Sequence, residues 1–575
     1  MFEGSSRPGV RGWGRGRRGA FGVAATLAVG ACVATVTVAG GGAAQAADSA
    51  AGAGAGAAFG IGHGGGRSLV PGDLLVSRAH YAGTAGMITP GVTVLPTGEV
   101  AIADGSFAHV WDNVSVDANF GITAPIYLDE LNGRGVRIGS VAVPTGTAGP
   151  AGRGHDVLTS SFSSKSELAL NLSTGGSSVT FMGYVAPANT LDASNGNTPG
   201  VIDPTNPDTQ AVYRAVGQLD AHGKVSVTET NAYSGDNGRA AILDDRTGLY
   251  YTAGNSNNGD GTSVPGVIFG TGAQLVKPAG KPEQAQRPGS PTPVGGFSVT
   301  RLPANTKADK LGKDTNFAGV TVHDNVLYYT KGSGGNGIDT VYFVDTTGTA
   351  CPQGVGLPVP GAPAPTSADA YDAATGRPAD NMCVLAGFPT ALAKSIKTPD
   401  VGVSSNTSAL GAMWFANSTT LYVGDSGNGS DTFANGGYTD AAAQNLAGIQ
   451  KWSLVNGIWT YDYTLNAGLG LGVPYTVAGL PTGTNAITGL PWTPATDGIR
   501  NFTGKVNANG TVTLYGVTTT IGGVSDYGAD PNKLVTVTDK ASATALPADE
   551  QFATLRTAGA GDVFRGVAFA PHAGW

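Results

Sequence analysis

The residues best suited to chemistry stand in short polar segments that precede apolar, β-branched strands. Three of these segments place an arginine at or beside the start of the strand, and a fourth places a lysine. The planar guanidinium fork of arginine suits carboxylates and sugar hydroxyls. We therefore predict a ligand-binding set from these segments and from one Gly/Asn/Asp-rich loop. Its members are Lys165, Asn237, Arg239, Asn316, Asp425, Arg500, Asn501 and Arg565.

Two carboxylates are weaker candidates for acid–base catalysis. Glu167 stands near the start of a strand, two residues from Lys165, and Asp497 precedes another strand. A glycosidase needs two such carboxylates about 5–10 Å apart, and Asp236 or Asp425 could also supply the second one. The simpler interpretation is that Glu167 is an ion-pair partner between neighbouring sheets, because buried charges must be paired in any case.

The strands that must position these groups recur in sets of four. Short runs rich in β-branched and aromatic residues alternate with Gly, Asn and Asp turns, which is typical of an all-β chain. Five complete sets are present. They comprise 164–172, 179–184, 213–219 and 225–229; 240–243, 249–252, 266–270 and 297–302; 318–322, 326–330, 340–344 and 382–387; 412–415, 420–423, 448–454 and 459–465; and 502–506, 512–517, 533–538 and 552–556.

The strands left over at the two ends predict a closed ring. One strand, 564–569, follows the last set, and three strands, 72–77, 122–131 and 136–143, precede the first set. Together they make a sixth set of four, which would remove the exposed sheet edges at the ends of the chain. We predict an all-β, six-bladed β-propeller. A seven-bladed ring is the alternative, because 144–163 or 466–496 could hide a further blade.

In a propeller the first strand of each blade lines the central channel. The loops that precede this strand and the loops that follow the second strand lie on one face, and such loops commonly carry function. The loops after the second strands are long here, at 253–262, 332–339, 425–432 and 518–531. Cations and carboxylates that converge there would form either a polar ligand pocket or a set of structural ion pairs.

Composition argues against several classes of function. The 575-residue chain has a net charge of −8, only 13% charged residues and no Lys/Arg stripe, so we expect no nucleic-acid partner. The seven histidines form no metal-binding pair, and no G-x-S-x-G nucleophile elbow occurs in a strand–turn–helix context. We expect no metal or cofactor. Calcium is the alternative, because 192–197 and 425–431 are rich in oxygen ligands, although Asn and Asp turns explain both loops equally well.

The beginning of the chain has the pattern of an export signal. Arg17 and Arg18 precede an apolar run at 20–39, and Ala44-Gln45-Ala46 is a small-x-small cleavage site. The twin-arginine and general secretory routes both remain open. We expect 1–46 to be a signal peptide, 47–68 an Ala/Gly-rich linker and 69–575 a single propeller domain. The mature chain should be a secreted monomer without a membrane segment; lipid anchoring at Cys32 is the alternative.

Cys351 and Cys383 are the two cysteines left after removal of the signal. In an exported chain such a pair indicates a disulfide, here one that closes a Pro/Ala-rich stretch. No histidine lies near either cysteine in the sequence, so a structural role is favoured over a catalytic one.

Several segments resemble a family of secreted bacterial and fungal β-propeller-like proteins of similar length. They are 164–170, 230–241, 336–345, 495–501 and 529–534. The resemblance extends over nearly all of the mature chain. It implies an exported propeller and assigns no activity.

These observations lead to two main hypotheses of function. The first is a carbohydrate-active hydrolase or lyase that acts on extracellular material through a polar pocket on one face. The second is a non-catalytic secreted protein that uses the same face to bind a small molecule or glycan, or to act as a scaffold.

Overall fold

The computed structural model describes most of the chain after residue 67, and all of the described residues belong to one compact unit, Gly65–Trp575. The predicted signal peptide and nearly all of the predicted linker therefore lie outside the described residues. The described ranges are 68–81, 89, 91–94, 100, 121–146, 157–161, 167–201, 210–255, 272–283, 294–296, 299–304, 316–332, 337–367, 371–372, 377–378, 380–393, 409–485, 489–522 and 530–572.

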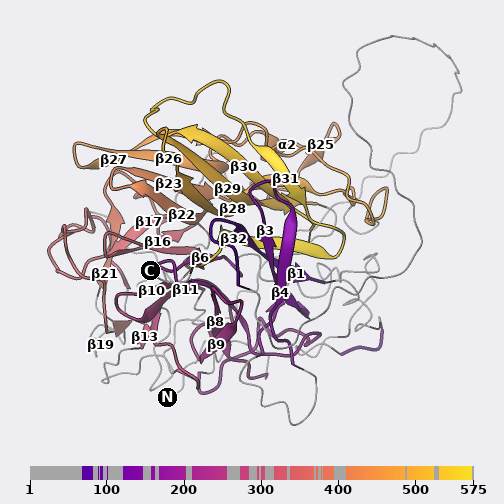
Figure 1. Cartoon of the computed structure of the whole chain (residues 1–575), viewed down its shortest axis with the longest axis horizontal. Helices are drawn as coiled ribbons and strands as arrows, with labels where there is room; N and C mark the ends of the chain where they lie inside the picture. The colour runs from indigo at the N-terminus through magenta and orange to yellow at the C-terminus, as the bar shows by residue number, and fades with distance from the viewer. Residues whose placement is uncertain are drawn as a thin grey trace, which may run out of the picture. The chain divides into compact units, whose positions relative to one another are not determined.

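Six sheets, in which nearly all strand pairs are antiparallel, form a six-bladed β-propeller (Figure 1). Blades 1 to 3 come first in the chain, and the strands of each run outward from the channel in chain order. Blade 1 has β6 (Asn171–Leu172), β7 (Ser178–Tyr184), β8 (Arg214–Asp220) and β9 (Val225–Thr230). Blade 2 has β10 (Gly238–Asp244), β11 (Leu249–Gly254), β12 (Ala273–Val276) and β13 (Gly295–Gly296). Blade 3 has β15 (Gly319–His323), β16 (Val326–Lys331), β17 (Thr340–Val344) and β21 (Asp380–Leu385), and β14 (Val299–Thr300) and β18 (Val355–Gly356) also pair with β21.

Blades 4 to 6 complete the ring. Blade 4 has β22 (Leu410–Asn417), β23 (Thr420–Asp425), β26 (Gly448–Val455) and β27 (Ile458–Leu465). Blade 5 has β28 (Ala495–Val506), β29 (Thr511–Ile521), β30 (Lys533–Lys540) and β31 (Ala553–Thr557). Blade 6 has β32 (Asp562–Phe569), β1 (Leu74–His80), β3 (Ile126–Leu131) and β4 (Arg137–Ala142). The small additions are β2 (Thr123–Ala124) paired with β5 (Ser160–Ser161), β19 (Tyr371–Asp372) with β20 (Arg377–Pro378), β24 (Phe433–Ala434) with β25 (Gly437–Tyr438), and the helix α2 (Thr439–Ala442).

The predicted closure of the ring is confirmed. β1 pairs antiparallel with β32 and with β3, so one C-terminal strand and three N-terminal strands share blade 6. The register pairs Leu74 with Phe569 and Val76 with Val567. The first strands of successive blades contact one another in the order β6, β10, β15, β22, β28, β32 and back to β6.

Small residues allow the first strands to approach one another around the channel. A Cβ atom on Gly319 would lie 2.5 Å from the carbonyl oxygen of Gly411, and one on Gly411 would collide with the carbonyl of Arg500. Glycine is therefore required where neighbouring backbones meet at the axis. Farther out, large side chains fill the space between blades, as in the ring contacts of Phe415 in blade 4 with His323 and Tyr328 in blade 3.

Blade 2 departs from the prediction at its outer edge. The range predicted for its third strand, 266–270, lies outside the described residues, and the third strand is β12. The predicted fourth strand at 297–302 is wrong, because β13 ends at Gly296 and β14 pairs in parallel with β21 of blade 3. The chain thus crosses to the next blade earlier than expected, and β14 covers an edge of β21 that would otherwise be open.

The described parts of the two ranges considered for a seventh blade contain no further sheet of four strands. Ser160–Ser161 forms only the short pair with β2, and 466–485 and 489–494 contribute isolated bridges such as Leu471 with Thr496. Within the described residues, no helix has both the length and the apolar character needed to span a membrane.

Candidate functional site

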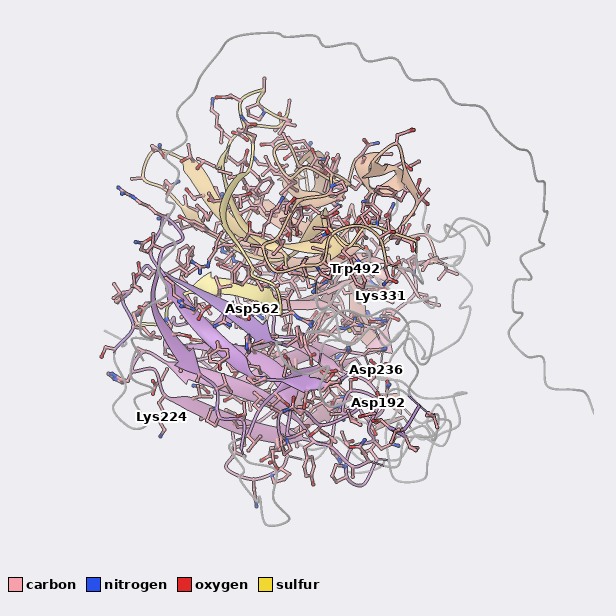
Figure 2. All side chains as sticks on the ribbon, turned by 90° about the vertical axis from the view of Figure 1, so that its right-hand side faces the viewer. Asp192, Lys224, Asp236, Lys331, Trp492 and Asp562 are labelled. Atoms are coloured by element: carbon pink, nitrogen blue, oxygen red, sulfur yellow. A yellow bond between two sulfur atoms is a disulfide. The ribbon has the colours of Figure 1, made fainter. Side chains whose placement is uncertain are left out.

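Most of the described candidate residues lie near the starts of first strands or the ends of second strands, on one side of the propeller, which we call the long-loop face. It consists of the segments that precede the first strands and those that follow the second strands. Figure 2 shows Asp192, Asp236, Lys331 and Trp492 along this side, whereas Lys224, in the turn between β8 and β9, lies on the opposite side. Lys165 lies outside the described residues. Asp497, Arg500 and Asn501 were predicted to precede a strand at 502–506, but they lie inside β28, which begins earlier, at Ala495.

Glu167 is enclosed just before β6. Its side chain is 0% exposed, and its Oε1 accepts the backbone N–H of Ser161 at 2.8 Å. Its Oε2 has no hydrogen-bond partner among the described residues. The next residue, Leu168, has a φ of 64°, and its carbonyl accepts the hydroxyl of Ser77 at 2.7 Å. A bulky residue rarely adopts this conformation, so blade 6 holds the backbone beside Glu167 in a strained geometry.

Burial determines the protonation of Glu167. It raises the pKa of the carboxyl group to about 8, while the Arg565 guanidinium, the Ser161 N–H, the Tyr184 hydroxyl and the Arg214 guanidinium act against this rise. The desolvation cost of the charged form therefore outweighs the two cations. Glu167 is mostly protonated at neutral pH.

Two fully buried arginines lie near Glu167. Arg565, in β32, donates to the hydroxyl of Tyr81 at 2.5 Å and to the carbonyl of Ser161 at 3.4 Å. Arg214, at the start of β8, donates to the carbonyls of Asp236, at 2.8 Å through Nε, and of Ser194, at 2.9 Å. Both guanidinium groups thus join segments that are distant in the chain. Arg565 was in the predicted set and Arg214 was not.

The segments that precede β10 and β15 are joined by Arg239. Its guanidinium donates to Oδ1 of Asn237 at 3.2 Å, to Oδ1 of Asn316 and to the carbonyl of Phe317 at 3.3 Å. Burial lowers the pKa of Arg239, and the Asp236 carboxylate acts against this. The structure therefore brings together Asn237, Arg239 and Asn316 of the predicted set.

Asp236 is held in the same cluster. Its carboxylate accepts the backbone N–H of Asn237 at 2.9 Å and the side-chain amide of Asn255, which follows β11. Burial raises the pKa of Asp236 to about 6, although the Arg239 guanidinium and these hydrogen bonds oppose the shift. This carboxyl group thus titrates close to neutral pH, next to a loop that follows a second strand.

Asp425 and Asp497 serve a second cluster between blades 4 and 5. Asp425 accepts the backbone N–H groups of Ala409 at 3.2 Å and Gly427 at 3.0 Å, and the side-chain amide of Gln450 at 3.0 Å. These bonds fix the loop that follows β23.

Asp497 closes the other side of this loop. It accepts the backbone N–H of Gly429 at 2.8 Å and the side-chain amide of Gln444 at 2.7 Å. Among the described residues, no hydrogen bond or ion pair joins Glu167 to Asp497. The two weak catalytic candidates therefore belong to separate clusters.

A small cavity lies where the first strands of blades 1 to 5 meet. Its volume is about 20 Å³, which holds about one water molecule. Its walls include Asn171, Ala240, Gly319, Gly411, Arg500 and Asn501. Asn501 also accepts the backbone N–H of Val567 at 2.7 Å, which ties β28 to β32.

Sequence reasoning missed Tyr81 and Tyr184, which contribute to the cluster around Glu167. Tyr184 is the last residue of β7 and Tyr81 directly follows β1, so both lie where a second strand ends, as Asp425 does in blade 4. The rule that selected Asp425 would have found them, had it not been limited to Gly, Asn and Asp loops. Arg214 carries no such signal, because a single arginine at the start of a third strand resembles any exposed strand residue.

The predicted disulfide is confirmed. Cys351 and Cys383 are bonded, with Cα atoms 6.1 Å apart. Asp345 lies close to the two sulfur atoms, but its carboxylate accepts the backbone N–H groups of Thr347 at 2.9 Å and Gly348 at 3.0 Å. The oxidised sulfurs and the occupied carboxylate make this a structural cluster.

The fold and the two polar clusters define the class of the molecule, a six-bladed β-propeller with a polar long-loop face. No model of a protein family matches the sequence, and no curated protein does. Two solved structures are of an ulvan lyase from a new family of polysaccharide lyases, PL25. Each alignment covers 77% of this chain and 82% of the lyase chain. Their sequence identities are 12% and 11%, their TM-scores are 0.30 and 0.29, and the second is bound to a GlcA(1-4)Rha3S unit. The structure of an acylaminoacyl peptidase of Pyrococcus horikoshii aligns at 8% identity and a TM-score of 0.25. That alignment covers 76% of this chain and 50% of the peptidase chain. Similarity at this level does not assign an activity.

Proposed function

We propose that this chain is an exported, non-catalytic propeller that binds a carbohydrate on its long-loop face. The observation that carries the proposal is that the described charged groups of this face hold its loops in place. Asp425, Asp497 and Arg239 each bond to two or more groups of neighbouring segments. Such an arrangement makes a rigid polar platform, which lowers the cost of ordering loops on binding.

The loop that follows β23 supplies the kind of groups that a sugar would meet. The Asp440 carboxylate accepts the hydroxyls of Ser430 at 2.7 Å and Thr432 at 2.8 Å, and these bonds lower its pKa. The side-chain amide of Asn428 lies in the same loop. Hydroxyl, amide and carboxylate groups at a partly exposed surface can exchange hydrogen bonds with sugar hydroxyls and bridging water.

A carbohydrate-active hydrolase or lyase is the second candidate, and Glu167 favours it. A carboxyl group that is protonated at neutral pH, and whose Oε2 has no hydrogen-bond partner among the described residues, has the properties of a general acid. Because the side chain is 0% exposed, this role requires that the surrounding segments open to substrate. The first proposal requires no such opening.

A glycan array probed with the mature chain tests the proposal. We expect binding to at least one polysaccharide, a loss of about tenfold or more in affinity with Asp440→Ala, and no change with Lys224→Ala on the opposite side. Bound glycans are then incubated with the chain and checked for cleavage. Products that appear with the wild type and disappear with Glu167→Gln would favour the enzyme, and binding to no glycan would reject both candidates.

A further inference from the structure

A lysine and an aspartate are in direct contact, with no exposure to solvent, between blades 4 and 5. Lys451 Nζ lies 2.9 Å from Oδ2 of Asp539, and both side chains are 0% exposed. The hydroxyl of Tyr422 donates to Oδ2 of Asp539, and that of Tyr463 donates to Oδ1 at 2.5 Å. Lys451 also donates to Tyr463 at 3.0 Å and to the carbonyl of Lys540 at 2.8 Å.

The strand register places these groups with little freedom to move. Lys451 is paired with Tyr422 on one side and with Tyr463 on the other, across β23, β26 and β27. Asp539 reaches them from β30 of the next blade, where it is paired with Val512. Phe502, Leu514, Val537 and other apolar side chains form the core around this contact. Amine and carboxyl are thus held together in a site with low polarity, where the charged forms lose most of their solvation.

Glu550 provides a second carboxyl group beside the pair. Its Oε1 accepts the backbone N–H of Lys540 at 2.9 Å, and its buried Oε2 has no hydrogen-bond partner among the described residues. Burial and the neighbouring Asp539 carboxylate raise the pKa of Glu550 to about 7, although the Lys540 N–H and the Lys451 ammonium oppose the rise. A carboxyl group of this kind can both accept and donate a proton near neutral pH.

From this geometry we propose that Lys451 and Asp539 form an intramolecular amide bond, with Glu550 as the proton relay. The ammonium of Lys451 gives one proton directly to the Asp539 carboxylate, whose Oδ2 lies 2.9 Å away. The neutral amine then attacks Cγ of Asp539, and a C–N bond forms. As the tetrahedral intermediate collapses, the nitrogen loses a second proton through Glu550 to the departing hydroxyl, and one C–O bond breaks. The ammonium and the carboxylate are thereby converted into an amide and one water molecule, and no oxidant or reductant is needed.

The two tyrosines fit this reaction. Their hydroxyls donate to the two oxygens of Asp539, and one of them is placed to stabilise the oxyanion of the tetrahedral intermediate. Burial, followed by the Asp539 carboxylate, raises the pKa of Tyr422, and burial together with the same carboxylate raises that of Tyr463, so both hydroxyls stay protonated. The product would covalently join β26 of blade 4 to β30 of blade 5. This inference does not depend on the ligand proposed for the long-loop face.

Intact mass spectrometry of the full chain, after reduction of the disulfide, tests the bond. We expect the wild type to be lighter than its sequence by one water molecule, whereas Lys451→Arg and Glu550→Gln should have their full sequence masses. The glutamine of the second variant would keep an acceptor for the Lys540 N–H, and position 550 is only partly buried, so Glu550→Gln should fold even if Lys451→Arg does not. After trypsin digestion, segment 398–500 should remain uncleaved at Lys451 and be joined to segment 534–540.

A wild-type chain with its full sequence mass and cleavage after Lys451 would overturn the proposal and leave an ordinary buried ion pair. Loss of water without the joined peptides would place the dehydration elsewhere and also overturn it. If Glu550→Gln still formed the bond to the same extent, the assignment of Glu550 as the proton relay would be wrong.

Discussion

Replacement of Glu167 by glutamine should change how the stability of the propeller depends on pH. In the folded chain burial raises the pKa of this carboxyl group from 4.5 to about 8. Below pH 4.5 the group is protonated in both the folded and the unfolded chain. As the pH rises, the unfolded chain releases the proton first, so the wild type loses stability until the pH passes the folded pKa near 8.

The size of this loss of stability follows from the pKa shift of Glu167. One unit of pKa difference corresponds to about 1.4 kcal/mol, so the interval from 4.5 to about 8 sets an upper limit of about 5 kcal/mol. Glutamine resembles the protonated acid, can still accept the N–H of Ser161, and does not titrate. Relative to the wild type, Glu167→Gln should therefore become more stable as the pH rises through this window.

Denaturant unfolding monitored by tryptophan fluorescence, at pH values from below 4.5 to above 8, measures the difference. Asp549→Asn, at an exposed carboxylate, is the matched control and should follow the wild-type profile. Parallel profiles for Glu167→Gln and the wild type would show that Glu167 is ionised in the folded chain. The explanation from burial would then be wrong.

Two further predictions concern the covalent and topological closure of the fold. Reduction of the Cys351–Cys383 bond, which spans 32 positions, should lower the free energy of unfolding by about 4 kcal/mol on a loop-closure model. The double Cys→Ser variant should start at the lower value and not respond to reductant; an unchanged midpoint on reduction of the wild type would count against this. Truncation after Gly561 removes β32 and leaves β1 with an open edge, so it should abolish the cooperative thermal transition, whereas truncation after His572 should preserve it. A full-sized transition in the shorter chain would refute the shared blade.

Ring closure could be predicted from the sequence because it depends on counting strands. Runs such as 420–423 and 512–517 have clear β patterns. When all such runs were grouped in sets of four, one strand was left over at the C-terminus and three at the N-terminus. The prediction was least accurate for strands that are very short or that pair with a neighbouring blade. β6 has two residues, β13 has two residues, and β14 joins a neighbouring blade, so none of them carries a periodic pattern long enough to recognise.

For the site, the sequence indicated where each candidate residue lies within its own blade. It did not indicate which residues of other blades lie next to it. Asn237, Arg239 and Asn316 came together because they lie just before or at the start of the first strands of adjacent blades. Glu167 lies just before the first strand of blade 1, and Asp497 lies near the start of the first strand of blade 5. These blades are not adjacent, and the two residues belong to different clusters. The contact of Lys451 with Asp539 links two interior strand positions of different blades, and no local pattern marks such a pair.

Whether a bound glycan stays intact is the most direct test of the proposed function. The measurement is a time course of newly formed reducing ends and of unsaturated sugar products, made with the mature chain and the glycan that it binds best. We predict saturable binding with no products over the time course. Products at a rate above that of the Glu167→Gln variant would contradict the proposal and make this propeller a carbohydrate-active enzyme.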